Sequence, residues 1–146
     1  MNPYVEMKNR HQQEVNDFPM VFAFNEQQFA KAMNKLGLNP EDTHLIYRFG
    51  DTGGFYLRSD ADKLKAMLDR HQHERDEAIA SDKKSKGYIY QMFRLELENH
   101  EYDYTEDLED TLAAVGLTID AIEGNKALKR GLDLAIKSIK KRSILQ

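Results

Sequence analysis

The sequence contains no cysteine. Disulfide bonds, thiolate nucleophiles and cysteine-ligated zinc are therefore excluded. Long apolar runs are missing as well: the longest wholly apolar stretch is Met20 to Phe24, which is far too short to span a bilayer. Because the first residues also lack the basic and apolar regions of a signal peptide, we expect a cytoplasmic protein with no membrane partner.

Proline is scarce, with three residues, and no proline- or serine-rich linker divides the chain. A length of 146 residues is typical of about one domain, so we expect a single domain over residues 1–146. The net charge is -4. This acidity argues against nucleic-acid binding by the domain as a whole, but it leaves open a local basic strip.

The apolar pattern predicts an α+β fold whose strands are confined to residues 1–58. Three short runs have the composition or the alternation of strands: residues 20–24, 44–49 and 55–58. Within the second run, Leu45, Tyr47 and Phe49 alternate and are expected on one side of the sheet. The glycine-rich segment 50–54 favours a hairpin between the last two runs. We therefore expect a small antiparallel sheet packed with a mainly helical part, residues 59–146.

Capping residues mark where the helices begin. Side chains that accept a hydrogen bond from a free helical N–H stand at five predicted starts: Asn2, Asn25, Ser59, Thr105 and Asn125. The predicted helices lie at residues 3–16, 26–36, 60–81, 87–100 and 106–115, followed by a short turn that Thr118 caps and a last helix from residue 126.

Charge is segregated in the last third of the chain. The segment from Glu96 to Asp110, called here the acidic segment, contains eight carboxylates and no lysine or arginine. The segment from Lys126 to Arg142 contains seven basic residues and one acid, Asp133. Such a pattern concerns steering and the choice of partner more than catalysis.

In helical projection, most basic residues of the last helix fall within about a third of the circle. They form the basic ridge: Lys126, Lys129, Arg130, Lys137, Lys140 and Lys141. Apolar residues occupy the opposite side: Leu128, Leu132, Ala135, Ile136 and Ile139. The apolar side is expected to dock on the core, and the ridge is either a solvated face or a docking surface for an acidic partner or for phosphates.

The acidic segment and the basic helix are joined by only about fifteen residues. Elements with so short a connection are usually neighbours in space. We therefore expect the ridge to lie near the acidic segment, either within one chain or across a two-fold dimer.

Two patterns resemble catalytic or metal motifs but have simpler explanations. Asp51-Thr52-Gly53 matches the triplet of aspartic proteases, whose chemistry needs two such carboxylates, yet the chain has one copy in a predicted turn. His71 and His73 cannot share a metal ion, because residues two apart on a helix point about 200° apart. His71 falls on the apolar stripe of its helix and is expected to be partly buried.

Glu96 and His100 stand four residues apart on one predicted helix face, which is a workable half-site for zinc or manganese. The remaining ligands would have to come from elsewhere, and the acids from Glu101 to Asp110 are the candidates. No HExxH motif is present. A metal is therefore not the favoured interpretation, and no cofactor is expected.

Three stretches of the sequence are informative together: Phe24 to Phe29, Met92 to Tyr102 and Asp110 to Thr118. They resemble a family of small uncharacterised proteins of bacteria, their phages and mobile elements, and the similarity covers most of the chain after Phe18. The resemblance implies a small cytosolic accessory protein and carries over no catalytic residue. It makes Asn99-His100-Glu101-Tyr102 the first place to look for a shared site.

A non-enzymatic interaction protein is the favoured function, because two opposite charge blocks are present while no nucleophile–base pair or complete metal set can be assembled. The partner is expected to be another protein or a second copy of the chain. The expected binding residues are Glu96, Asn99, His100, Glu101, Tyr102, Lys137, Lys140 and Lys141.

Two alternatives stay open. The first is a metal-dependent hydrolase-like enzyme that uses Glu96 and His100. The second is a phage accessory protein that binds nucleic acid through the ridge, or that imitates nucleic acid with the acidic segment. Nucleic acid is the less favoured partner because of the net acidity.

Overall fold

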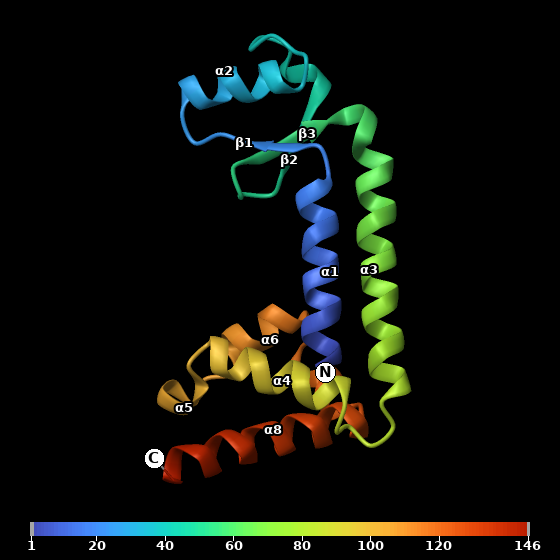
Figure 1. Ribbon diagram of the computed structural model, residues 1–146, viewed down its shortest axis with the longest axis vertical. Helices are drawn as coiled ribbons and strands as arrows, with labels where there is room; N and C mark the ends of the chain where they lie inside the picture. Colours follow the sequence, from blue (N-terminus) through green and yellow to red (C-terminus); the bar gives the residue numbers. More distant parts are fainter. Residues whose placement is uncertain (1, 146) are drawn as a thin grey trace. The chain divides into compact units, whose positions relative to one another are not determined.

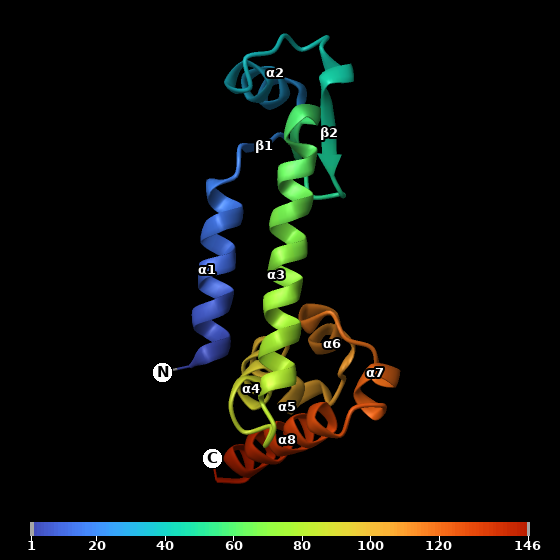
Figure 2. The same ribbon diagram turned by 90° about the vertical axis from the view of Figure 1, so that its right-hand side faces the viewer.

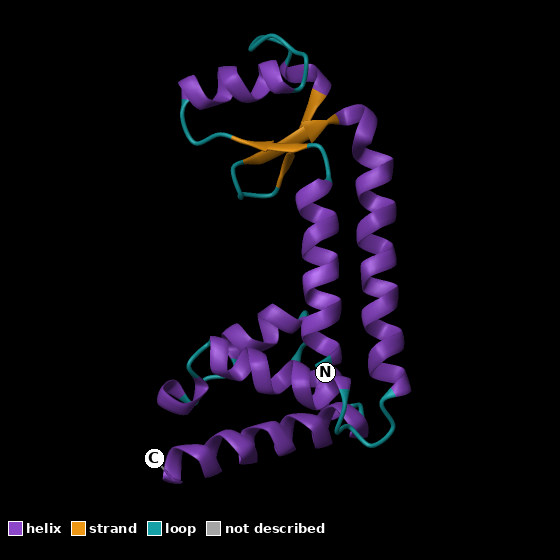
Figure 3. Ribbon diagram, in the orientation of Figure 1, coloured by secondary structure: helices purple, strands orange, loops and turns teal. Residues whose placement is uncertain are grey.

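The computed structural model describes residues 2–145, with side chains for residues 2–142, and consists of helices and one small antiparallel sheet (Figures 1 and 3). The elements follow in the order α1 (Pro3–Asp17), β1 (Met20–Phe22), α2 (Glu26–Lys35), η1 (Thr43–Leu45), β2 (Ile46–Phe49), β3 (Gly54–Leu57), η2 (Arg58–Asp60), α3 (Ala61–Ser81), α4 (Tyr88–Asn99), α5 (Tyr102–Thr105), α6 (Glu109–Val115), α7 (Ile119–Glu123) and α8 (Lys126–Leu145). The α+β class is confirmed, with the strands near the N-terminus and helices after them.

The chain divides into two compact units. The sheet unit comprises residues 11–72, and the helical unit comprises residues 1–10 together with 73–146. Helices α1 and α3 each contain residues of both units. The expectation of one domain over the whole chain stays a prediction.

The sheet unit is built around the strand order β1-β3-β2, with both strand pairs antiparallel. The predicted hairpin joins β2 to β3, and Gly50 and Gly53 in its turn have positive φ values of 55° and 82°, which side chains other than glycine rarely adopt. Helix α2 covers one face of the sheet. The core between them contains the buried residues Ala32, Met33 and Phe55.

The start of α2 follows the predicted capping pattern. The Asn25 side chain accepts a hydrogen bond from the Gln28 N–H at 2.8 Å. The Gln28 side chain reaches back and accepts from the Phe24 N–H, also at 2.8 Å, rather than from Asn25 itself. The strand β1 ends at Phe22, two residues before the predicted end, and the Phe24 N–H belongs to the cap of α2 instead.

The second strand begins later than expected, so Leu45 is not part of it. Residues Thr43–Leu45 form a helical turn, so β2 begins only at Ile46. Its pairing places Arg48 opposite the buried Phe55, and Ile46 packs against the α2 core. Leu45 and Tyr47 are instead 41% and 43% exposed.

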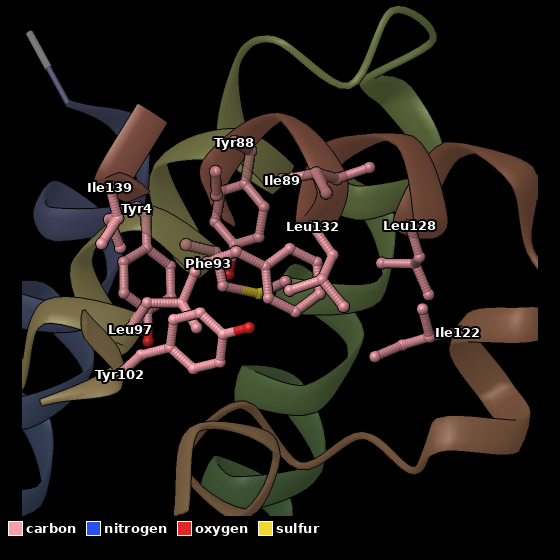
Figure 4. Packing of buried hydrophobic residues seen from close by; sticks show 12 residues of the cluster. Tyr4, Tyr88, Ile89, Phe93, Leu97, Tyr102, Ile122, Leu128, Leu132 and Ile139 are labelled. Atoms are coloured by element: carbon pink, nitrogen blue, oxygen red, sulfur yellow. The ribbon is translucent and has the colours of Figure 1, made fainter. Parts of the chain in front are cut away.

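The core of the helical unit lies mainly between α4 and α8, with Tyr4 of α1 packed at one end (Figure 4). Its buried apolar residues are Tyr4, Tyr88, Ile89, Met92, Phe93, Leu97, Tyr102, Ile122, Leu128, Leu132, Ala135 and Ile139. Figure 2 gives a second view of this unit, in which α6 and α7 lead into α8. The expectation that the apolar side of α8 docks on the core is thus confirmed.

The loop before α4 and α4 itself each contact α8 at close range. The Ser85 hydroxyl donates to the Ala127 carbonyl oxygen at 2.5 Å. At Gly131 of α8, an added Cβ would lie 2.3 Å from Cγ2 of Ile89. Glycine is therefore required at position 131 by the approach of the two helices.

Candidate functional site

Most of the acidic segment lies on the surface, but its first residue does not. The other seven carboxylates are exposed, whereas Glu96 is 2% exposed in the interior of the helical unit. The segment is also interrupted: α5 ends at Thr105 and α6 begins only at Glu109. A continuous helix from Glu106 was expected, and that expectation is wrong because Glu106 adopts a left-handed φ of 54°.

The buried Glu96 carboxylate is satisfied by two donors from the same unit. Its Oε1 atom accepts from Nζ of Lys8 at 3.0 Å and from Nδ2 of Asn99 at 2.9 Å. The side chain of Lys8 is 48% exposed, so the ammonium keeps contact with water while it neutralises the buried charge. Removing one partner from such a pair is costly, and Glu96 therefore ties the first turns of α1 to α4.

Two buried tyrosines next to this cluster, Tyr4 and Tyr88, have raised pKa values. The rings of Tyr4 and Tyr88 meet edge to face with centroids 5.5 Å apart. Burial raises the pKa of Tyr4 far above its usual value, and the nearby Glu96 charge raises it further. Burial likewise raises the pKa of Tyr88. Both phenols stay protonated at neutral pH, as expected of core residues.

The two residues of the suggested metal half-site, Glu96 and His100, lie at the C-terminal end of α4. Helix α4 ends at Asn99, so His100 lies past the helix as its C-cap, and its backbone N–H donates to the Glu96 carbonyl. The Glu96 carboxylate is already held by Lys8 and Asn99. No group of three or more histidine or acidic side chains that could hold a metal occurs within the described part of the chain.

The stretch from Asn99 to Tyr102 forms the reversal between α4 and α5. Glu101 has a left-handed φ of 56°, and its carbonyl oxygen accepts from the N–H groups of Tyr104 and Thr105. The Tyr102 side chain is 7% exposed and belongs to the core (Figure 4). Asn99, Glu101 and Tyr102 thus have structural contacts that account for their presence.

The basic ridge lies on the outer face of α8. Its residues are exposed except for the partly buried Lys129, while the opposite side of the helix is in the core. A shallow groove of about 440 Å³ runs along the ridge. It is lined by Glu123, Lys126, Lys129, Arg130, Asp133, Leu134 and Lys137.

Within the ridge, Lys129 differs from the other cations. Its Nζ atom lies 3.3 Å from Asp133 and 3.6 Å from Glu123. The hydrogen bond to Asp133 and the two negative charges raise the pKa of Lys129. Lys137, Lys140 and Lys141 form no ion pair with any side chain of residues 2–142, so their charges face solvent.

The two charge blocks meet through a residue outside the ridge. Arg142 pairs with Glu98, whose carboxylate also forms an ion pair with Arg94 at 2.8 Å. Burial alone would raise the pKa of Glu98, but the two arginines hold it below its usual value. The blocks are therefore neighbours within one chain at the end of α8, while the ridge lysines take no part in the contact.

The sheet unit contains a pair of buried histidines, of which only His71 was expected to be buried. His71 is 2% exposed, as its place on the apolar stripe indicated, and it stacks on His11, which is 7% exposed. The Glu14 carboxylate lies 3.5 Å from Nε2 of His71 and also pairs with Arg70. In the sequence, the three-residue spacing of His11 and Glu14 indicates that they share one helix face. Nothing in the sequence indicates that this face contacts His71 of α3.

The exposed histidine behaves as expected. His73 lies on the surface, and its Nε2 atom is 3.0 Å from Glu77, one turn along α3. The two histidines thus point in different directions, and the Asp51-Thr52-Gly53 triplet lies in the hairpin turn.

Comparison with known families places the chain in one of them. Residues 3–138 match the model of a family of unknown function, DUF7659, and the chain belongs to this family. No curated protein and no solved structure gives a match. The expected resemblance to an uncharacterised family is confirmed, while an origin in bacteria, phages or mobile elements stays a prediction.

A helix that crosses a bilayer needs about 20 consecutive, mainly apolar residues. Among the described residues, no helix combines the length and the apolar character that crossing a membrane demands.

Proposed function

We propose that this protein is a non-enzymatic interaction module of the cytoplasm, and that the basic ridge of α8 docks an acidic surface of a protein partner. The observation that carries the proposal is the state of Lys137, Lys140 and Lys141, which are exposed and have no ion-pair partner among the side chains of residues 2–142. The acidic segment that was available to neutralise them is reached by Arg142 instead.

The ridge is held on a rigid support. Its helix is anchored by Leu128, Leu132, Ala135 and Ile139, each at most 4% exposed. A partner therefore meets cationic groups whose backbone is already ordered, which lowers the entropic cost of binding. Exposed cations of this kind mainly increase the association rate and select the sign of the partner's charge.

The chemistry of the interior is consistent with this role. The buried polar cluster of Lys8, Glu96 and Asn99 is internally satisfied, and its contacts serve to connect α1 with α4. A hydrolase built on Glu96 and His100 has no such support, because the first residue is engaged and the second lies past the end of the helix.

The test compares two triple variants of the full chain. In one, Lys137, Lys140 and Lys141 are replaced by glutamine. In the matched control, the same change is made at the exposed loop residues Lys83, Lys84 and Lys86. The probe is a fluorescent glutamate-rich peptide, followed by anisotropy at low and high salt.

The ridge variant should bind about tenfold more weakly at low salt, because each lost contact with a carboxylate contributes up to about 1 kcal/mol. The loop variant should bind like the parent, and the difference should shrink at high salt. Equal binding by both triple variants would contradict the proposal. Retardation of duplex DNA by the parent and not by the ridge variant would assign the ridge to phosphates instead.

A further inference from the structure

The sheet unit has a free strand edge with an adjoining groove. In the order β1-β3-β2, β1 pairs on one side only. Its register places Val21 opposite Phe55, and the next residue of that parity, Ala23, donates its N–H to the Gly53 carbonyl at 3.0 Å. Because backbone groups alternate in direction along an antiparallel strand, the N–H and C=O of Phe22 point away from β3.

A groove of about 440 Å³ lies beside this edge, between β1 and α2. Its lining residues are Met20, Val21, Phe22, Gln28, Lys31, Ala32 and Lys35. Ala32 forms its apolar floor with a small side chain that is 4% exposed. The space thus adjoins the unpaired backbone groups and extends under one side of α2.

Two cations line the α2 side of the groove. Lys31 and Lys35 are one helical turn apart, both are exposed, and neither forms an ion pair with any side chain of residues 2–142. On the opposite face of the sheet, Phe22 is 53% exposed. A segment along the edge would therefore meet positive charge on one face and an aromatic ring on the other.

We infer that the β1 edge is a binding site for an extended acidic peptide segment of a partner protein, which adds to the sheet as a fourth strand. Side chains of a strand alternate between its two faces. Glutamate or aspartate at alternate positions meets Lys31 and Lys35, and apolar side chains between them cover Phe22. Main-chain bonds to Phe22 supply affinity, and the lysines supply selectivity.

A second copy of the chain fits this edge less well. Antiparallel pairing of two β1 strands about a two-fold axis would place both α2 helices on the same face of the joined sheet. The lysine pairs of the two copies would then face each other across the seam, and like charges in opposition are destabilising. The charge at the edge selects an acidic segment over self-association.

The probe that tests this site is a short labelled peptide of alternating glutamate and valine. All measurements use the full chain in which Lys137, Lys140 and Lys141 are already glutamine, so that the basic ridge does not contribute. This background also separates the present inference from the proposed function of α8, because either can fail without the other.

Three comparisons decide the outcome. The double variant Lys31→Glu, Lys35→Glu should bind the acidic peptide at least tenfold more weakly. The double variant Lys83→Glu, Lys84→Glu is the control and should bind it unchanged. A peptide of alternating lysine and valine should bind at least tenfold more weakly than the acidic one. A peptide N-methylated on the residue whose N–H faces the Phe22 carbonyl should bind about fivefold more weakly, because the main-chain hydrogen bond that it loses contributes about 1 kcal/mol.

Failure of the acidic peptide to bind the background protein would overturn the inference. Unchanged binding of the N-methylated peptide would exclude strand addition, and equal binding of the lysine peptide would exclude charge selection. A Phe22→Pro variant provides an independent check, because proline removes the outward N–H at position 22 without removing a bond to β3. This variant should bind the acidic peptide several-fold more weakly. Circular dichroism of each variant confirms that the fold is retained.

Discussion

The imidazole rings of His11 and His71 lie face to face, with centroids 3.9 Å apart and planes 13° from parallel. Both side chains are buried in the sheet unit, where α1 and α3 meet. Burial lowers the pKa of His71 below its ordinary value of 6.5, the adjacent His11 lowers it further, and Glu14 opposes the shift. A second positive charge in this stack is therefore unfavourable.

This arrangement predicts a loss of stability in mild acid. Because the folded-state pKa of His71 is lower than the unfolded value, the unfolded chain binds more protons, and the free energy of unfolding should fall as the pH drops below about 6.5. A His11→Phe variant keeps a ring in the stack and removes the neighbouring imidazole that lowers the pKa of His71. Thermal midpoints at pH 8 and pH 5.5 should differ less in this variant than in the parent.

The neighbouring charges do not obscure this measurement. Glu14 has its pKa held below 4.5 by the hydrogen bond from Arg70, so it titrates below the relevant pH window. Arg70 does not titrate in it either. An unchanged pH dependence in His11→Phe would show that the stack does not control the acid transition.

Loss of the lysine beside the buried carboxylate should destabilise the helical unit. Lys8→Met leaves Glu96 with Asn99 as its remaining partner, and we expect a loss of about 1–3 kcal/mol in the free energy of unfolding. The double variant Lys8→Met, Glu96→Leu removes the buried charge as well and should recover part of that loss. Urea titration of the two variants measures both effects. A Lys8→Met protein as stable as the parent would mean that water replaces the lysine.

Gly131→Ala distinguishes two opposite effects. In an unconstrained helix this change increases stability by about 0.5–1 kcal/mol. Here the new Cβ would lie 2.3 Å from Ile89, and overpacking of a core typically costs about 1–3 kcal/mol. We expect a net loss, measured as a lower denaturation midpoint. A net gain would mean that α4 and α8 separate without cost.

The contact between the charge blocks should depend on one arginine. Arg142→Gln should cost about 0–1 kcal/mol at low salt and less at high salt, because its partner Glu98 is exposed enough for screening. The triple change of Lys137, Lys140 and Lys141 to glutamine should leave the thermal midpoint unchanged at both salt concentrations. A larger effect of the triple change at low salt would indicate that the ridge lysines do reach the acidic segment.

Local signals in the sequence were sufficient for most of the fold. Asn25, Thr118 and Asn125 cap the helices that they were expected to cap, each through a side-chain oxygen that accepts a helical N–H. The apolar stripes of α4 and α8 likewise identify their buried faces. These features depend on residues a few positions apart, which is why a single sequence contains them.

The features that sequence reasoning missed depend on distant partners. Burial of Glu96 requires Lys8, which is 88 positions away, and a carboxylate in an acidic segment gives no sign of such a partner. The break at Glu106 is similar, because left-handed conformations of residues other than glycine are set by their surroundings. The candidate site was therefore located only in part: the ridge was predicted, and the contacts of Glu96, Asn99 and Tyr102 were not.

The helical unit is formed by two separate segments of the chain, and this has a consequence for its folding during synthesis. Its core requires Tyr4 and α8 together, whereas the sheet unit is one continuous segment, residues 11–72. Since a ribosome releases the N-terminal part first, the sheet unit can fold while α4 and α8 are still being made. Tyr4 and Lys8 then lack their partners in the nascent chain, and the Tyr4 ring stays exposed until α8 has been synthesised. Closure of the helical unit is thus a late event, because it needs residues made before the sheet unit together with residues made after it.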